Sequence, residues 1–190
     1  MHHYDYVVVG AGSAGSALAN RLSESGKFTV CLLEAGGSDK KFWVQMPLGY
    51  GKVFHDPSVN WRYMTEPEPN LDNQSIYWPR GKVLGGSSSI NAMVWVRGHK
   101  RDYDEWNSVA PGWGWNNVQK IFNRIENWDG TSNISRGTNG PQPVHDVSSD
   151  VHPLTISYLK AASQVGIKTN ADYNGPNMEG ASCYQISTKG

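Results

Sequence analysis

Three glycines and one acidic residue near the amino end have a spacing that suits phosphate and sugar chemistry. Gly10, Gly12 and Gly15 form the pattern GxGxxG, and Glu34 follows Gly15 by 19 residues. The first glycine permits a tight turn, the second lets the backbone approach a pyrophosphate that a Cβ atom would displace, and the third lets a helix pack closely on a sheet. The acid can accept hydrogen bonds from a ribose hydroxyl and repels a 2′-phosphate. These residues predict a site for an adenine dinucleotide.

The surrounding segments must form a strand, a turn, a helix and a second strand for the pattern to have this meaning. Residues 6–9 are apolar and mostly β-branched, which is typical of a buried parallel strand. Residues 16–22 carry apolar side chains at helical spacing, Gly26 is a plausible helix stop, and residues 28–33 form a second apolar run. Backbone N–H groups at the start of such a helix bind phosphate. A chance glycine-rich turn is the alternative, and this stretch alone leaves NAD and FAD both open.

A second glycine-rich stretch lies about midway along the chain. Gly85 and Gly86 are followed by three serines, residues 87–89. Bare backbone and short hydroxyl groups suit close contact with a polar ring or a phosphate. A flexible linker is the alternative reading of such a composition. Apolar residues stand directly on both sides of the stretch, and they argue against a free linker.

Charge and hydropathy exclude several classes of partner. The chain has 190 residues, with 17 basic and 17 acidic side chains and a formal net charge of zero. This balance gives no electrostatic case for nucleic acid or for an acidic membrane surface. No apolar run approaches the length of a membrane span. The 8 Trp and 9 Tyr fit a ligand cleft or a buried interface better than a charged surface.

Cysteine and histidine give weaker signals. Cys31 and Cys183 are far apart and form no CxxC pattern, so we expect a reducing compartment and a cytoplasmic protein, with peripheral membrane association left open. His145 and His152 are seven residues apart and have no spacing typical of metal ligands, so we expect no metal site.

The rest of the chain predicts an incomplete two-domain α/β protein. Residues 39–60 lack a sustained period and carry several aromatic side chains, which favours an ordered, lid-like segment. Residues 115–128 and 153–165 have helical spacing of apolar side chains. We expect a Rossmann-like domain at 1–150, with a parallel sheet and flanking helices. We expect the start of an α+β substrate-binding domain at 151–190.

Both glycine-rich stretches together resemble the glucose–methanol–choline (GMC) family of FAD-dependent alcohol oxidoreductases. The residues that carry the resemblance are the GAGSAG at 10–15, the LLEAG at 32–36 and the run from Gly81 to Asp104. Asn60-Trp61 and the EPEP at 66–69 are similar to choline-dehydrogenase-like members. The resemblance spans essentially the whole chain, and the run from Gly81 favours FAD over NAD.

The resemblance implies a set of cofactor-binding residues. Gly10, Gly12, Ser13, Ala14 and Gly15 would hold the pyrophosphate, and Glu34, with Ala35 beside it, would hold the adenosine ribose. Those expected along the flavin side are Arg80, Gly85, Gly86, Ser87, Asn91, Ala92, Met93 and Val94. Members with covalently attached flavin have a histidine just before this Asn. Ile90 occupies that place here, so the expected FAD is non-covalent.

The resemblance also implies what is missing. Full members are several hundred residues long, and their catalytic histidine lies near the C-terminus, so we expect no catalytic residue in this chain. The expected activity is oxidation of an alcohol to an aldehyde or ketone by hydride transfer to the flavin N5. Expected partners are the alcohol and the remaining C-terminal part of the same enzyme, and a homo-oligomer is left open. An NAD-dependent dehydrogenase and a non-catalytic dinucleotide-binding fragment are the alternatives.

Overall fold

A computed structural model describes residues 2–131 and 134–189, and the chain divides into two compact units, Met1–Ala92 and Met93–Gly190. Each unit is described by itself. The domains expected at 1–150 and 151–190 stay a prediction.

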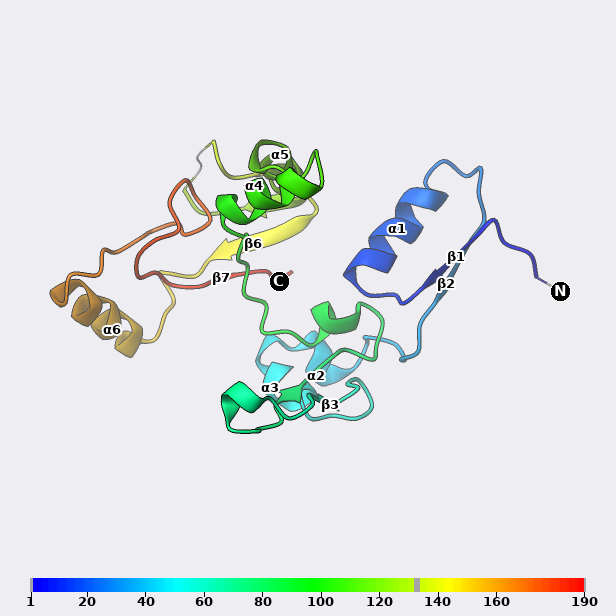
Figure 1. The fold of residues 1–190 in the computed structure, drawn as a ribbon, viewed down its shortest axis with the longest axis horizontal. Helices are drawn as coiled ribbons and strands as arrows, with labels where there is room; N and C mark the ends of the chain where they lie inside the picture. The colour runs from blue at the N-terminus through cyan, green and yellow to red at the C-terminus, as the bar shows by residue number, and fades with distance from the viewer. Residues whose placement is uncertain (1, 132–133, 190) are drawn as a thin grey trace. The chain divides into compact units, whose positions relative to one another are not determined.

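The first unit begins with the strand, turn, helix and strand that the sequence predicts. They are β1 (Tyr6–Val9), α1 (Ser13–Ser23) and β2 (Val30–Leu33), and β1 runs parallel to β2 with Tyr6 opposite Val30. Figure 1 shows α1 alongside this strand pair. A parallel pair needs a crossover between its strands, and α1 supplies it.

The prediction that residues 6–9 form a buried strand is wrong for this chain. Val8 is buried, and its Cγ1 lies beside Gly15 of α1, but Val7 is 58% and Val9 83% exposed. Successive side chains of a strand point to opposite faces, so α1 covers the face of Val8 and leaves the other uncovered. Parallel sheets are normally covered on both faces. Within the described residues no second layer packs on the face of Val7 and Val9.

The remainder of the first unit consists of short elements around a small apolar cluster. They are α2 (Phe42–Gln45), η1 (Pro47–Gly49), α3 (Tyr50–Val53), β3 (Tyr63–Met64), η2 (Pro69–Leu71), β4 (Tyr77–Trp78) and η3 (Gly86–Ser89). β3 and β4 form an antiparallel pair. The cluster contains Val53, Val59, Val83 and Ile90, all almost fully buried. The segment 39–60 is therefore partly helical and supplies core residues, and its lid role stays a prediction.

The second unit contains helices and a small mixed sheet. Its elements are α4 (Lys100–Val109), α5 (Trp115–Ile125), β5 (Glu126–Trp128), β6 (Gln142–Asp146), α6 (Pro153–Gln164) and β7 (Gln185–Ile186). The sheet order is β5-β6-β7, with β6 parallel to β5 and antiparallel to β7. The helix predicted over residues 115–128 ends at Ile125, because residues 126–128 form a strand that pairs with residues 142–144. Pairing with a distant strand overrides the local helical pattern here.

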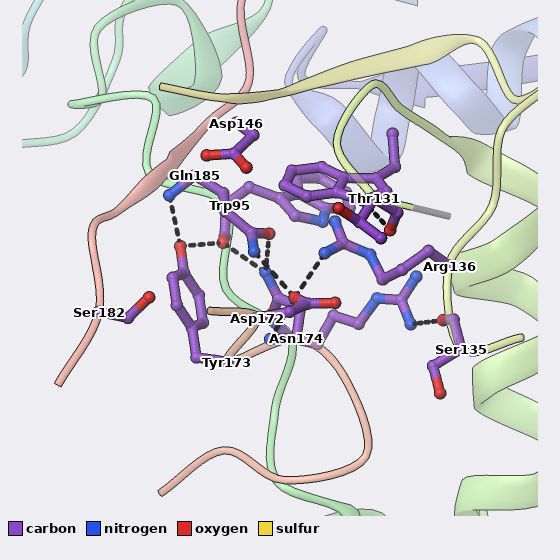
Figure 2. Close-up of polar contacts among 12 residues, drawn as sticks. Trp95, Thr131, Ser135, Arg136, Asp146, Asp172, Tyr173, Asn174, Ser182 and Gln185 are labelled. Carbon is purple, nitrogen blue, oxygen red and sulfur yellow. Dashed lines mark hydrogen bonds and ion pairs between the residues drawn. The ribbon is translucent and has the colours of Figure 1, made fainter. Parts of the chain in front are cut away.

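A buried charge cluster forms the centre of the second unit. Glu126 is fully buried, and its carboxylate accepts hydrogen bonds from Arg97 at 2.6 Å and from Arg136 at 2.8 and 2.9 Å. Arg136 also donates to Asp172 at 2.7 Å. Figure 2 shows Arg136 and Asp172 among the polar side chains of this core. Two positive and two negative charges balance, which is the condition under which buried ions are tolerated.

None of the helices within residues 2–131 and 134–189 has both the length and the apolar character that crossing a bilayer requires.

His145 on β6 links two other segments of the second unit. Its Nδ1 lies 2.5 Å from Asp129 Oδ2, and its Nε2 lies 3.1 Å from the carbonyl oxygen of Thr188. Both partners are acceptors, so the arrangement favours an imidazolium that donates from both nitrogens. The hydrogen bond to Asp129 raises the pKa of His145 above its usual 6.5, although burial opposes the shift. Burial acts to raise the pKa of Asp129, but hydrogen bonds from His145 and the Asp146 N–H outweigh it and lower that pKa.

The pair of His145 and Asp129 predicts that a small part of the free energy of unfolding depends on pH. The pKa of His145 is higher in the folded protein than in the unfolded chain. Its contribution to the free energy of unfolding is therefore complete at pH values below the unfolded-state pKa, and it is lost as pH rises through the folded-state pKa. His145→Gln should therefore destabilise the protein at about pH 5.5 and have less effect at about pH 8.5. The pair is partly exposed to solvent, so the difference should be at most about 1 kcal/mol. Urea unfolding of both proteins at each pH measures it, and an equal difference at both pH values would contradict the assignment.

Candidate cofactor-binding site

The turn after β1 has the geometry that its glycines predict. Gly10 has a φ of +94°, in the left-handed region that favours glycine, and its N–H donates to the Leu33 carbonyl at 2.8 Å. A Cβ atom on Gly15 would collide with the carbonyl oxygen of Gly10. The fold itself therefore requires glycine at both positions.

Gly12 is different, because nothing in the protein requires glycine there. Its φ of −75° and ψ of −171° suit any residue, and the nearest atom to an added Cβ would be Gly86 Cα at 3.9 Å, an ordinary van der Waals contact. The absence of a side chain leaves open space directly before α1. Such a space fits a group that approaches the backbone closely, which is the role of this glycine in dinucleotide-binding turns.

The start of α1 offers N–H groups to an anion. Ser16 N–H makes the first backbone bond of the helix, to the Gly12 carbonyl at 2.9 Å, and among the described residues no side chain caps this end. The preceding N–H groups of Ser13, Ala14 and Gly15 are those that a helix leaves without an intrahelical partner. Together with the helix dipole they suit a phosphate.

Glu34 follows β2 and reaches back to the turn. Its Oε2 accepts the Ala11 N–H and its Oε1 accepts the Gly36 N–H, each at 2.8 Å. A carboxylate has about four acceptor positions, so both oxygens retain capacity for sugar hydroxyls. The two backbone bonds hold the carboxylate in a fixed orientation at the end of the strand pair.

The two glycine-rich stretches of the sequence contact each other. Gly85 N–H donates to the Ala11 carbonyl at 2.8 Å, and Gly12 and Gly85 form a parallel bridge. Gly86 has a φ of +59°, and a Cβ atom there would lie 2.9 Å from Gly12 Cα. Close approach of the two backbones therefore explains the glycine pair midway along the chain.

A groove of about 530 Å³ lies at this junction, and we call it the glycine groove. It is lined by Val9, Gly10, Gly12, Leu33, Glu34, Ala35, Trp61, Gly81 and Gly86. Five of these were expected from the sequence: Gly10, Gly12, Glu34, Ala35 and Gly86. The groove is mostly backbone and small side chains, and Trp61 is the only aromatic side chain among these lining residues.

Trp61 and Gly81 are groove residues that the sequence analysis did not assign. Trp61 is 42% exposed, and the Lys82 ammonium lies 4.5 Å from its ring centroid. A Cβ atom on Gly81 would collide with the Gly86 carbonyl oxygen. In the sequence, Asn60-Trp61 is noted only for its similarity to choline-dehydrogenase-like members. Nothing in the residues around Trp61 indicates that its side chain reaches a turn about fifty residues away.

Other expected cofactor residues do not line the groove. The Arg80 guanidinium lies over the Trp78 ring at 5.0 Å, and Ser87 Oγ accepts the Gly81 N–H at 3.1 Å. Asn91 and Ala92 are exposed. Met93 and Val94 belong to the second unit, in which Met93 has a φ of +60° and its carbonyl accepts the Ser187 N–H at 2.8 Å. Flavin-side roles for these residues stay predictions.

Among the described residues no three His, Cys, Asp or Glu side chains gather in a way that could hold a metal ion.

A glycine turn between parallel strands, an uncapped helix start and an acid after the second strand are the arrangement used by dinucleotide-binding α/β proteins. The family model of GMC oxidoreductases matches residues 4–190. The chain belongs to this family, and its fold is the N-terminal FAD-binding fold of GMC oxidoreductases.

Relatives with a curated description agree with this assignment. The chain is 44% identical over 188 residues to an alcohol dehydrogenase [acceptor] of Pseudomonas putida, covering 98% of this chain and 34% of that protein. It is 48% identical over 177 residues to an oxygen-dependent choline dehydrogenase of Rhizobium etli, covering 93% of this chain and 32% of that protein. The chain thus spans about a third of the length of these relatives.

Solved structures are also similar. The crystal structure of pyridoxine 4-oxidase from Mesorbium loti matches with a TM-score of 0.91 and 31% identity, over 98% of this chain and 37% of that one. A formate oxidase structure matches with a TM-score of 0.84 and 26% identity, over 97% and 34%.

Proposed function

We propose that the protein carrying this chain oxidises an alcohol to an aldehyde or ketone with FAD. When bound, FAD supplies the redox chemistry, because its N5 accepts the hydride from the carbinol carbon. A base removes the hydroxyl proton, and we place that base outside this chain. The membership of the family and the alcohol-oxidising relatives support the reaction class.

This chain contributes the binding of the cofactor. The open space at Gly12 supports the proposal most directly, since neither backbone conformation nor packing accounts for a glycine there. The N–H groups at the start of α1 would hold the pyrophosphate, with Ser13, Ala14 and Gly15 as donors. Glu34 would accept hydrogen bonds from the adenosine ribose, with its carboxylate already oriented by Ala11 and Gly36.

The proposed FAD is held without a covalent bond. Ile90 occupies the position at which the resemblance places a flavin-linking histidine in covalent members. The Ile90 side chain is 3% exposed and packs in the apolar cluster with Val53, Val59 and Val83. A buried hydrocarbon side chain has no atom that could form such a link.

The strand pair β1–β2 would be the beginning of a larger Rossmann-like sheet. Two parallel strands alone are too few for independent stability. Val7 and Val9 leave an apolar face exposed, and the curated relatives are about three times as long as this chain. We assign the missing strands to the C-terminal remainder of the same polypeptide.

Cys31 and Cys183 are free, which fits the reducing cytoplasm proposed for the protein.

The proposal is tested on the full-length protein that carries this chain. Purified protein should show flavin absorbance that survives gel filtration, and acid precipitation should release FAD. Anaerobic addition of an alcohol from a panel that includes choline and benzyl alcohol should bleach the flavin. Protein that lacks flavin after reconstitution with FAD, or flavin that NADH reduces and no alcohol does, would overturn the proposal.

A further inference from the structure

Asn60 is a buried polar residue that directly precedes Trp61 and makes three side-chain hydrogen bonds. Its side chain is 2% exposed. Nδ2 donates to the Phe54 carbonyl at 2.9 Å, and Oδ1 accepts the N–H groups of Arg62 at 2.8 Å and Arg80 at 3.0 Å. Polar groups this deeply buried destabilise a protein unless they are hydrogen-bonded, so an amide here needs all three contacts.

The partners of Asn60 flank two residues of the glycine groove. Arg62 directly follows Trp61, and Arg80 directly precedes Gly81. The backbones of the same two segments are also joined. The Trp61 N–H donates to the Arg80 carbonyl at 2.9 Å, and Asn60 pairs with Gly81. One side-chain oxygen therefore ties together the two chain segments that supply Trp61 and Gly81 to the groove.

The backbone beside Trp61 also requires this support. Arg62 has a φ of +54°, a left-handed conformation that is strained for a residue with a Cβ atom. The bond from Asn60 Oδ1 to the N–H two residues later is an Asx turn, which stabilises such a conformation. Strained residues persist where surrounding contacts hold them, and they gather at ligand sites.

We propose that Asn60 is a positioning residue for the cofactor groove: it fixes Trp61 and Gly81 in the geometry that binds FAD, and it does not touch the cofactor itself. The inference rests on the proposed function, because it assigns the glycine groove to FAD. It predicts that the amide of Asn60 affects FAD affinity through Trp61.

The test uses Asn60→Asp in the full-length protein. Aspartate keeps the acceptor for Arg62 and Arg80 but replaces the donor with an oxygen that faces the Phe54 carbonyl. The dissociation constant for FAD of the apoprotein, measured by quenching of flavin fluorescence, should rise about tenfold, because FAD binding must then order the Trp61 and Gly81 segments that the amide holds in place in the wild type. Visible circular dichroism of the bound flavin should change as well.

Asn174→Asp is the matched control. Asn174 is also 2% exposed, and its Oδ1 accepts the Arg97 N–H while its Nδ2 donates to the Trp95 carbonyl and to Gln185. It lies in the second unit and lines no part of the glycine groove. Both variants should lower the melting temperature, but FAD affinity should fall in Asn60→Asp alone. If an aspartate variant does not fold, Asn60→Ser and Asn174→Ser give the same comparison.

A double-mutant cycle separates positioning from general destabilisation. Trp61→Ala alone should weaken FAD binding. Asn60→Asp should then weaken FAD binding by less in the Trp61→Ala protein than in the wild-type protein. Additive effects, or wild-type FAD affinity in a destabilised Asn60→Asp, would overturn the inference and leave the proposed function intact. A wild-type protein that does not bind FAD would instead overturn the proposed function.

Discussion

Gly12→Ala is expected to give a folded protein that no longer retains FAD. The backbone at Gly12 is acceptable for alanine, and the added methyl group would lie 3.9 Å from Gly86 Cα. The protein therefore has room for the methyl group. The methyl group would, however, occupy the space that a pyrophosphate needs in order to reach the N–H groups at the start of α1. Loss of about 3 kcal/mol or more, a hundredfold or more in affinity, is the expected scale. Gly12→Val should show the same effect more strongly.

Gly15→Ala separates a ligand effect from a folding effect. Its Cβ atom would collide with the Gly10 carbonyl oxygen whether or not a cofactor is present. We expect this variant to lose stability even as the apoprotein, whereas Gly12→Ala should melt near the wild-type apoprotein. Thermal unfolding of the apoproteins and FAD content after gel filtration measure the two effects. A Gly12→Ala protein with normal FAD content would contradict the placement of the pyrophosphate.

The contrast between these glycines also shows how far a sequence pattern can be interpreted. The spacing of Gly10, Gly12 and Gly15 predicts the turn. The apolar runs around them predict the helix and both strands, because each of these signals lies within one local segment. The glycine pattern also predicts different roles for the three glycines, with the ligand role at Gly12 and the backbone roles at Gly10 and Gly15. The folded structure adds the contacts behind the two backbone roles, which are the left-handed φ of Gly10 and the Gly10 carbonyl oxygen that a Cβ atom on Gly15 would meet.

Long-range contacts are the part that the sequence does not predict. Trp61 joins the groove because Asn60 links it to residue 80, and this pairing across about twenty residues leaves no periodic signal. The same limit applies to Glu126, which falls within a helical pattern but belongs to a strand. Local periodicity predicts whether a segment is a helix or a strand, whereas backbone pairing with a distant segment decides where β5 begins.

Glu126→Gln is expected to destabilise the protein by about 3–5 kcal/mol, the scale for breaking a buried ion pair. The Glu126 carboxylate accepts hydrogen bonds from both arginines, from Trp95 Nε1 at 2.7 Å and from the Gly137 N–H at 3.1 Å. Glutamine has the same shape but removes the charge and places an NH₂ group against donors. Arg97 and Arg136 would then remain buried with Asp172 as the counter-charge, and burial already lowers the pKa of Arg97.

Charge balance gives this prediction a stricter test than loss of stability alone. Adding Arg97→Met to Glu126→Gln leaves Arg136 paired with Asp172, so the buried net charge returns to zero and part of the stability should return. Glu24→Gln is the matched control, since Glu24 pairs with Arg21 in solvent and should contribute at most about 1 kcal/mol. Urea unfolding of the full-length protein measures these three variants and the single Arg97→Met variant. If the double variant is as unstable as the two single variants combined, unpaired charge is not the cause, and shape or hydrogen-bond geometry around Glu126 must be.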